Sequence, residues 1–118
     1  MAVFYNCTGL TKVEIGNGVT HIGNQVFDGC AAIEELFYNA QCELNTSFRG
    51  WGNALKKVVI GNSTPSIGNN VFAGCSSLMD VTIGSGITSI GSFAFAGCNS
   101  LTTATIPDSV TSIGDYAF

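Results

Sequence analysis

The chain has few charged residues and very few cations. Lysine and arginine together number four among 118 residues, against eight acidic residues, and the net charge is −4. Nucleic-acid binding normally requires a clustered basic face, so nucleic acid is not expected as a partner. No apolar run approaches the roughly 20 residues of a membrane-spanning helix, so we expect no membrane span. The opening residues, MAVFYNCTG, lack a basic segment followed by an apolar stretch, so we expect no signal peptide in this chain.

Histidine and cysteine are also too few, or too regularly spaced, for most catalytic and metal sites. There is one histidine, and the five cysteines are an odd number, which excludes a complete set of disulfides within one chain. A zinc site needs about four closely spaced cysteine or histidine ligands. The cysteines instead recur at long intervals along the chain.

What the sequence does contain is a repeat. Phenylalanines recur at separations of 23, 45, 23 and 23 residues, where 45 is the sum of 23 and 22. They are Phe4, Phe27, Phe72, Phe95 and Phe118, and the first four are each followed three residues later by a cysteine: Cys7, Cys30, Cys75 and Cys98. A period of this length is typical of solenoids, in which stacked units cover one another's apolar positions.

We interpret residues 1–118 as one segment of about five repeats of 22 to 23 residues. The repeats are 10–32, 33–54, 55–77, 78–100 and 101–118, preceded by a partial repeat at 1–9. Because the chain both begins and ends inside a unit, we expect it to be part of a longer array.

Each repeat combines three local patterns. The first, L-x-x-V-x-I, alternates apolar and polar residues and predicts a half-buried strand. The second, V-T-x-I-G, as in residues 19–22, 87–90 and 110–113, predicts a shorter β-branched strand ended by glycine. The third, F-x-x-C, predicts one turn of α-helix or 3₁₀-helix.

The combined pattern, L-x-x-I-x-I-P-x-x-V-T-x-I-G-x-x-A-F-x-x-C, resembles the BspA-like (Treponema pallidum type) leucine-rich repeat family. The resemblance covers the whole chain and is weakest at 33–54. It implies a right-handed repeat solenoid, with a parallel β-sheet on the concave side and short strands or 3₁₀ turns on the convex side. The family is typical of large secreted or surface-anchored proteins of host-associated bacteria and some protists, and it is linked to adhesion and binding rather than catalysis.

The cysteines in the F-x-x-C column are predicted to be small buried plugs. Free cysteine is among the most buried residue types, and none of the four has a cation within three residues to lower the thiol pKa. Adjacent rungs bring Cys7 near Cys30 and Cys75 near Cys98, but parallel side chains would keep the Cβ atoms about 4.8 Å apart, wider than the ~3.8 Å that disulfides prefer. We therefore predict reduced thiols. Cys42 takes the position of Val19 and is also expected in the core.

Catalysis is not predicted from any residue combination. A triad would have to use His21, which takes an outward position equivalent to that of Ser66 and Ser89. We expect no catalytic residues, no metal ligands, no cofactor and no enzymatic activity.

Two regions are candidates for binding. Phe37 and Val59 should lie side by side on the outer face of the sheet, with Met79 nearby, and a contiguous apolar patch can mark an interface; the alternative is a contact formed by packing in a crystal or an array. Arg49 and Trp51 lie in the irregular repeat 33–54, which loses the I-G turn; there the alternative is a packing repair after a deletion.

A column of charged residues with alternating sign is expected to neutralise itself. Its members are Lys12, Glu35, Lys57 and Asp80.

The predicted function is a non-catalytic binding or adhesion segment of a cell-surface or secreted protein. It would recognise a protein or another host-surface macromolecule through the concave sheet. The alternatives are a structural spacer that projects another domain, and a repeat region attached to an enzyme. The spacing of Phe118 and Phe4 also makes head-to-tail self-association possible.

Overall fold

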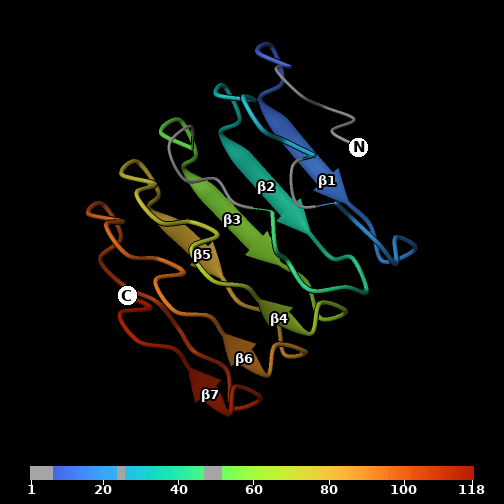
Figure 1. The fold of residues 1–118 in the computed structure, drawn as a ribbon, viewed down its shortest axis with the longest axis vertical. Coiled ribbons are helices and arrows are strands. Elements are labelled where there is room, and N and C mark those ends of the chain that lie inside the picture. Colours follow the sequence, from blue (N-terminus) through green and yellow to red (C-terminus); the bar gives the residue numbers. More distant parts are fainter. Residues whose placement is uncertain (1–6, 24–25, 47–51) are drawn as a thin grey trace.

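The structure is a computed structural model that describes residues 7–23, 26–46 and 52–118. The chain winds into a coil with two parallel β-sheets, so the predicted right-handed repeat solenoid is confirmed (Figure 1). The larger sheet contains β1 (Lys12–Ile15), β2 (Glu35–Tyr38), β3 (Lys57–Ile60) and β5 (Asp80–Thr82), in that order. The smaller sheet contains β4 (Ser66–Ile67), β6 (Ser89–Ile90) and β7 (Ser112–Ile113).

Strand pairing follows the sequence period. In the larger sheet Leu36 pairs with Val13 on one side, 23 positions earlier, and with Val58 on the other, 22 positions later. In the smaller sheet Ile67, Ile90 and Ile113 pair at intervals of 23. Backbone hydrogen bonds therefore run from each turn of the coil to the next, which leaves the strands of each sheet in register.

The core lies between the two sheets and along the turns that join them. On β2 and β3 every second side chain is buried, as the alternating pattern predicts. The phenylalanine column is internal: the Phe72 and Phe95 rings stack with centroids 5.3 Å apart, and both side chains are at most 1% exposed. In the turns that the structure describes, the buried members of the two columns are Phe27, Phe72 and Phe95, and Cys30, Cys75 and Cys98.

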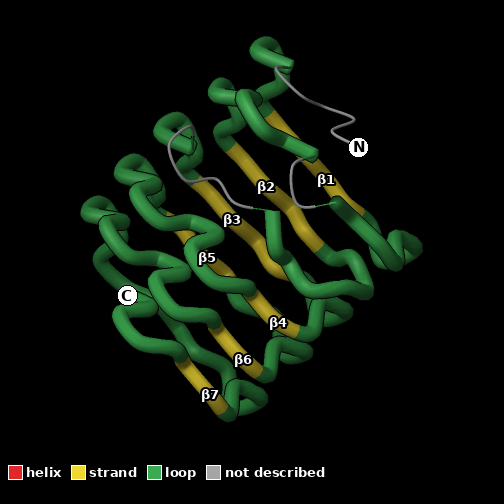
Figure 2. Tube along the Cα trace, viewed as in Figure 1, coloured by secondary structure: helices red, strands yellow, loops and turns green. Residues whose placement is uncertain are grey.

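The F-x-x-C segments are turns, and the prediction of a helical turn there is wrong. Figure 2 shows loops and strands but no helix in the described chain. In the turn around Phe72, two residues have positive φ: Asn70 (62°), two positions before Phe72, and Gly74 (77°), inside the F-x-x-C segment; only three residues separate them. Because an α-helix needs a continuous run of negative φ, the segment keeps only an i to i+3 bond, in which Cys75 N donates to Phe72 O at 3.2 Å.

The irregular repeat also differs from the prediction. It retains the isoleucine position of V-T-x-I-G, because Leu44 is 1% exposed and bridges to Ile67. Tyr38 pairs with Ile60, 22 positions later, whereas Leu44 bridges 23 positions, so the missing residue lies between Tyr38 and Leu44. The Tyr38 hydroxyl donates to the carbonyl of Glu43 at 3.3 Å. The buried Tyr38 therefore stabilises the shortened segment between Tyr38 and Leu44.

Two predicted strands do not form. Residues 101–106, the first pattern of the last repeat, adopt no strand, and neither do residues 19–22. The equivalent part of the next turn contributes only the isolated bridge at Leu44, so residues 19–22 have no regular strand to pair with on that side.

Close stacking of the turns predicts a position-dependent effect of glycine substitution. A Cβ atom at Gly84 would lie 2.6 Å from the carbonyl carbon of Gly61, whereas one at Gly16, the equivalent position near the start of the coil, would meet nothing within 4 Å. We expect Gly84→Ala to lower the free energy of unfolding by about 1–3 kcal/mol, as overpacking does. Gly16→Ala is the matched control and should stay close to the parent in urea denaturation. Equal effects of the two substitutions would contradict this close approach.

Candidate functional site

The outer face of the larger sheet carries the predicted apolar pair. Phe37 on β2 and Val59 on β3 are direct partners in the strand register, and both side chains are half-buried. They line a shallow groove of about 260 Å³ together with Glu14, Ile15, Gly16, Tyr38, Asn39 and Gly61. The two residues are thus adjacent, as expected, but less exposed than expected.

Two lysines account for part of this burial. The ammonium groups of Lys12 and Lys57 lie 5.2 Å and 5.6 Å from the centroid of the Phe37 ring. At exposed sites such cation–π contacts contribute roughly 0.5–1 kcal/mol each. Lys12 also forms an ion pair with Glu14 at 3.2 Å. The phenylalanine is therefore held between cations from both neighbouring strands.

The charged column has the predicted register but not the predicted ion pairs. Lys12 is opposite Glu35, and Glu35 is opposite Lys57. Within the described residues, however, the ion pairs join Lys12 to Glu14 and Lys56 to Glu34. Both signs line a hollow of about 410 Å³ formed by Thr11, Lys12, Glu34, Glu35, Lys56, Lys57 and Asp80. This surface is mixed in charge rather than selective for one sign.

The other predicted binding residues are not part of this groove. Met79 is 53% exposed, and its backbone N–H donates to Lys56 O at 3.0 Å. It therefore belongs to the column that contains Lys56 rather than to the column of Phe37 and Val59. Arg49 and Trp51 lie outside the described residues.

Three of the five cysteines are buried, and all five are free thiols. Cys30 and Cys75 are 0% exposed and Cys98 is 9% exposed. Burial, with a smaller contribution from Cys98, raises the pKa of the Cys75 thiol to about 12; burial also raises the pKa values of Cys30 and Cys98. Since the thiolate is the nucleophilic form, these residues are poor nucleophiles.

The remaining thiols and the histidine are no better placed for chemistry. Cys7 and Cys42 are half-buried and pack against the core, and the Cys42 sulfur lies 3.4 Å from the Tyr38 hydroxyl. His21 is exposed. The part of the chain that the structure describes holds no group of three or more histidine, cysteine or acidic residues that could bind a metal ion. The same residues include no helix with the length and hydropathy of a membrane span.

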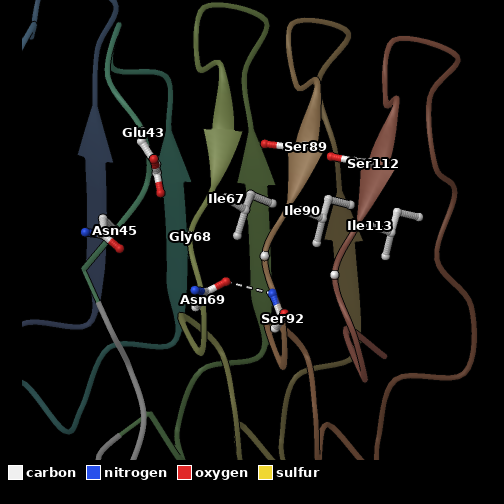
Figure 3. A pocket seen from close by; sticks show the side chains of 12 residues that line it. Glu43, Asn45, Ile67, Gly68, Asn69, Ser89, Ile90, Ser92, Ser112 and Ile113 are labelled. Carbon is white, nitrogen blue, oxygen red and sulfur yellow. Dashed lines mark hydrogen bonds between the residues drawn. The ribbon is translucent and has the colours of Figure 1, made fainter.

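A second groove, of about 550 Å³, follows the smaller sheet and was not predicted from the sequence (Figure 3). Ile67, Ile90 and Ile113 line it, with Ser89 and Ser112 beside them. Asn45 and Asn69 also line it, and Asn69 Oδ1 accepts a hydrogen bond from Ser92 N at 2.8 Å. Elsewhere Asn39 and Asn62 bond the next turn in the same way. These side chains join successive turns, so we interpret this groove as structural.

A family model described as "BspA type Leucine rich repeat region" matches residues 1–48 and 44–118 in six copies. Three solved bacterial proteins are similar in structure. A leucine-rich repeat protein from Eubacterium ventriosum has a TM-score of 0.89 and 29% identity over 99% of this chain and 32% of that chain. A leucine rich cell surface protein from Faecalibacterium prausnitzii has a TM-score of 0.70 and 32% identity over 98% of this chain and 31% of that one.

A leucine-rich repeat protein from Bacteroides ovatus has a TM-score of 0.62 and 28% identity, over 99% of this chain and 24% of that chain. The chain thus spans a third or less of the length of these relatives. The comparison with curated proteins gives no match.

The buried thiols predict a defined reactivity pattern. In the folded chain at pH 8, a thiol reagent should modify the half-buried Cys7 and Cys42 first, because burial and a raised pKa keep Cys30, Cys75 and Cys98 protonated and covered. After denaturation without reductant, titration should count all five. A count of one or three would mean that disulfides had formed.

Proposed function

The chain belongs to the BspA-type leucine-rich repeat family, and on that premise we propose that it is a non-catalytic binding segment of a cell-surface or secreted protein. It recognises a protein or another host-surface macromolecule through the outer face of the larger sheet. One observation carries the proposal: Phe37 and Val59 meet on a sheet face, and cations lie directly beside them. A structural relative is named a cell surface protein, which supports the proposed location.

The layout of this face suits protein recognition. Interface hot spots are aromatic or apolar anchors surrounded by polar groups that exclude water. Phe37 provides the anchor, and Lys12 and Lys57 form part of the polar rim. Both lysines can turn from the ring to carboxylates of a partner, because their present contacts are weak and exposed to solvent.

The described side chains support a role in binding rather than catalysis. The thiols of Cys30, Cys75 and Cys98 have raised pKa values, so they are protonated near neutral pH. His21 is exposed, whereas Cys30 and Cys75 are fully buried. A nucleophile paired with a base, which covalent catalysis requires, is therefore not formed by these residues.

Replacing the apolar pair tests the proposal. In the double variant Phe37→Thr and Val59→Thr, both positions take the residue that Thr82 provides in the same column, so we expect the fold to be retained. Surface plasmon resonance against a panel of purified extracellular-matrix proteins should show binding by the parent chain and at least a tenfold loss in the variant. The matched control is Ile113→Thr, which removes a 48% exposed apolar side chain from the smaller sheet.

Two outcomes would count against this function. Equal binding by the parent and the double variant would place recognition elsewhere, and no binding by the parent chain to the panel would favour the structural-spacer alternative. Circular dichroism of each variant distinguishes lost binding from lost folding.

We also propose that the chain in isolation associates head to tail. Phe118 is 52% exposed, and its ring stacks on Phe95 with centroids 5.2 Å apart. The two rings, Cys98, Leu101, Thr102, Thr103 and Ala104 line an apolar hollow of about 290 Å³. One more turn, from a second copy or from a longer chain, would bury this hollow. Phe4, the residue expected to meet Phe118, lies outside the described residues.

Sedimentation velocity checks this association. The parent chain should show a sedimentation coefficient that rises with concentration, because the exposed ring favours contact with a second copy. Phe118→Ser should remain monomeric over the same range, whereas Met79→Ser, which removes an exposed apolar side chain from the larger sheet, should behave as the parent. A concentration-independent monomer for the parent would disprove head-to-tail stacking.

A further inference from the structure

Two exposed aromatic residues occupy backbone positions that do not suit them. Asn70, Phe93 and Tyr116 hold equivalent places, two residues before Phe72, Phe95 and Phe118, and their φ values are 62°, 58° and 54°. Asparagine tolerates this left-handed region, but a bulky residue there is an outlier. An asparagine at 93 or 116 would therefore fit the backbone better than the aromatic residue that is present.

The strain is not offset by burial of the rings. Phe93 is 42% exposed and Tyr116 is 76% exposed. The two rings stack on each other, with centroids 5.3 Å apart and planes at 21°. Strained backbone is often found at ligand sites, so these largely exposed rings are candidates for contact with a ligand.

A groove lies beside Phe93. Asn70 and Phe93 occupy equivalent positions in successive turns. Because the Asn70 side chain is shorter than the Phe93 ring, the ring extends further from the surface than Asn70 does. The groove has a volume of about 750 Å³ and is lined by Asn53, Asn70, Ala73, Gly74, Phe93, Ala96 and Gly97. This volume is within the range of roughly 300–1,000 Å³ for small-molecule sites. Because Tyr116 covers one face of Phe93, the other face is the one directed toward the turn of Asn70.

The groove matches a neutral ligand that has both an apolar face and hydroxyl groups. Among the residues that the structure describes, those that line it are all uncharged, which favours a neutral ligand over an ionic one. The Phe93 ring provides a flat apolar surface, next to alanine and glycine residues. The carboxamides of Asn53 and Asn70 provide polar groups nearby. We propose that this groove binds a neutral saccharide chain, with the C–H face of one sugar ring stacked on Phe93 and its hydroxyls hydrogen-bonded to Asn53.

Peptide docking is less well supported by the same geometry. Proline-rich peptides bind grooves lined by several aromatic residues. Here the second ring is stacked against the first and does not line the groove, so the described lining residues offer one open aromatic face, that of Phe93. Tyr116 accordingly acts as a positioning residue, because its ring stacks on one face of Phe93 and fixes the orientation of the Phe93 ring. The saccharide site uses none of the residues of the protein-binding face and goes beyond the function proposed above.

Isothermal titration calorimetry of the whole chain tests the site. The probes are cellohexaose, mannohexaose and N-acetylchitohexaose, with a proline decapeptide as the competing class. We expect saturable binding of at least one oligosaccharide. Phe93→Asn should weaken it at least tenfold, and Tyr116→Asn should weaken it several-fold by freeing the ring. Thermal unfolding of Phe93→Asn should be unchanged or shifted upward, because asparagine suits a positive φ.

The double variant Phe37→Thr and Val59→Thr is the matched control and should retain saccharide binding, which separates this site from the protein-binding face. The proposal is overturned if none of the three oligosaccharides binds at millimolar concentration, or if the proline peptide alone binds. Parent-like saccharide binding by Phe93→Asn would also overturn it. A lower unfolding temperature for Phe93→Asn would show that the ring is retained for packing, and this result would also overturn the proposal.

Discussion

The in-register stacking of successive turns is the constraint on which the rest of this structure depends. Parallel strand pairing at intervals of 22 and 23 residues places like residues above like residues. Apolar positions then form continuous columns, and each turn covers the apolar edge of the one before. The stacked rings of Phe72, Phe95 and Phe118 and the buried cysteines beside them are consequences of that pairing.

The same stacking uses up groups that could otherwise react. The Cys98 sulfur donates to the carbonyl of Phe72, and asparagine side chains bond the backbone of the following turn. Cysteine recurs here because it is small and apolar, and burial keeps it protonated. Polar groups that remain available to a ligand are therefore those on the outward positions of the sheets and turns.

Those outward positions do not share the regularity of the core, and this is where the sequence was least informative. The adjacency of Phe37 and Val59 follows from the repeat period alone. The placement of both lysines over the Phe37 ring does not, because long side chains choose among several neighbours of similar energy. Likewise, opposite charges in one column suggested ion pairs along it, whereas Lys12 instead reaches Glu14 on its own strand.

The sequence by itself determined the coil, the parallel pairing and the burial of the phenylalanine and cysteine columns, because a strict period admits one register in which every apolar position is covered. Only the tertiary structure decided the local backbone. It showed that left-handed residues such as Asn70 and Gly74 replace a helical turn, and that Leu44 fills the isoleucine position of the shortened repeat. It also set Phe93 beside a groove. These features depend on dihedral angles and on contacts between turns, which residue spacing does not encode.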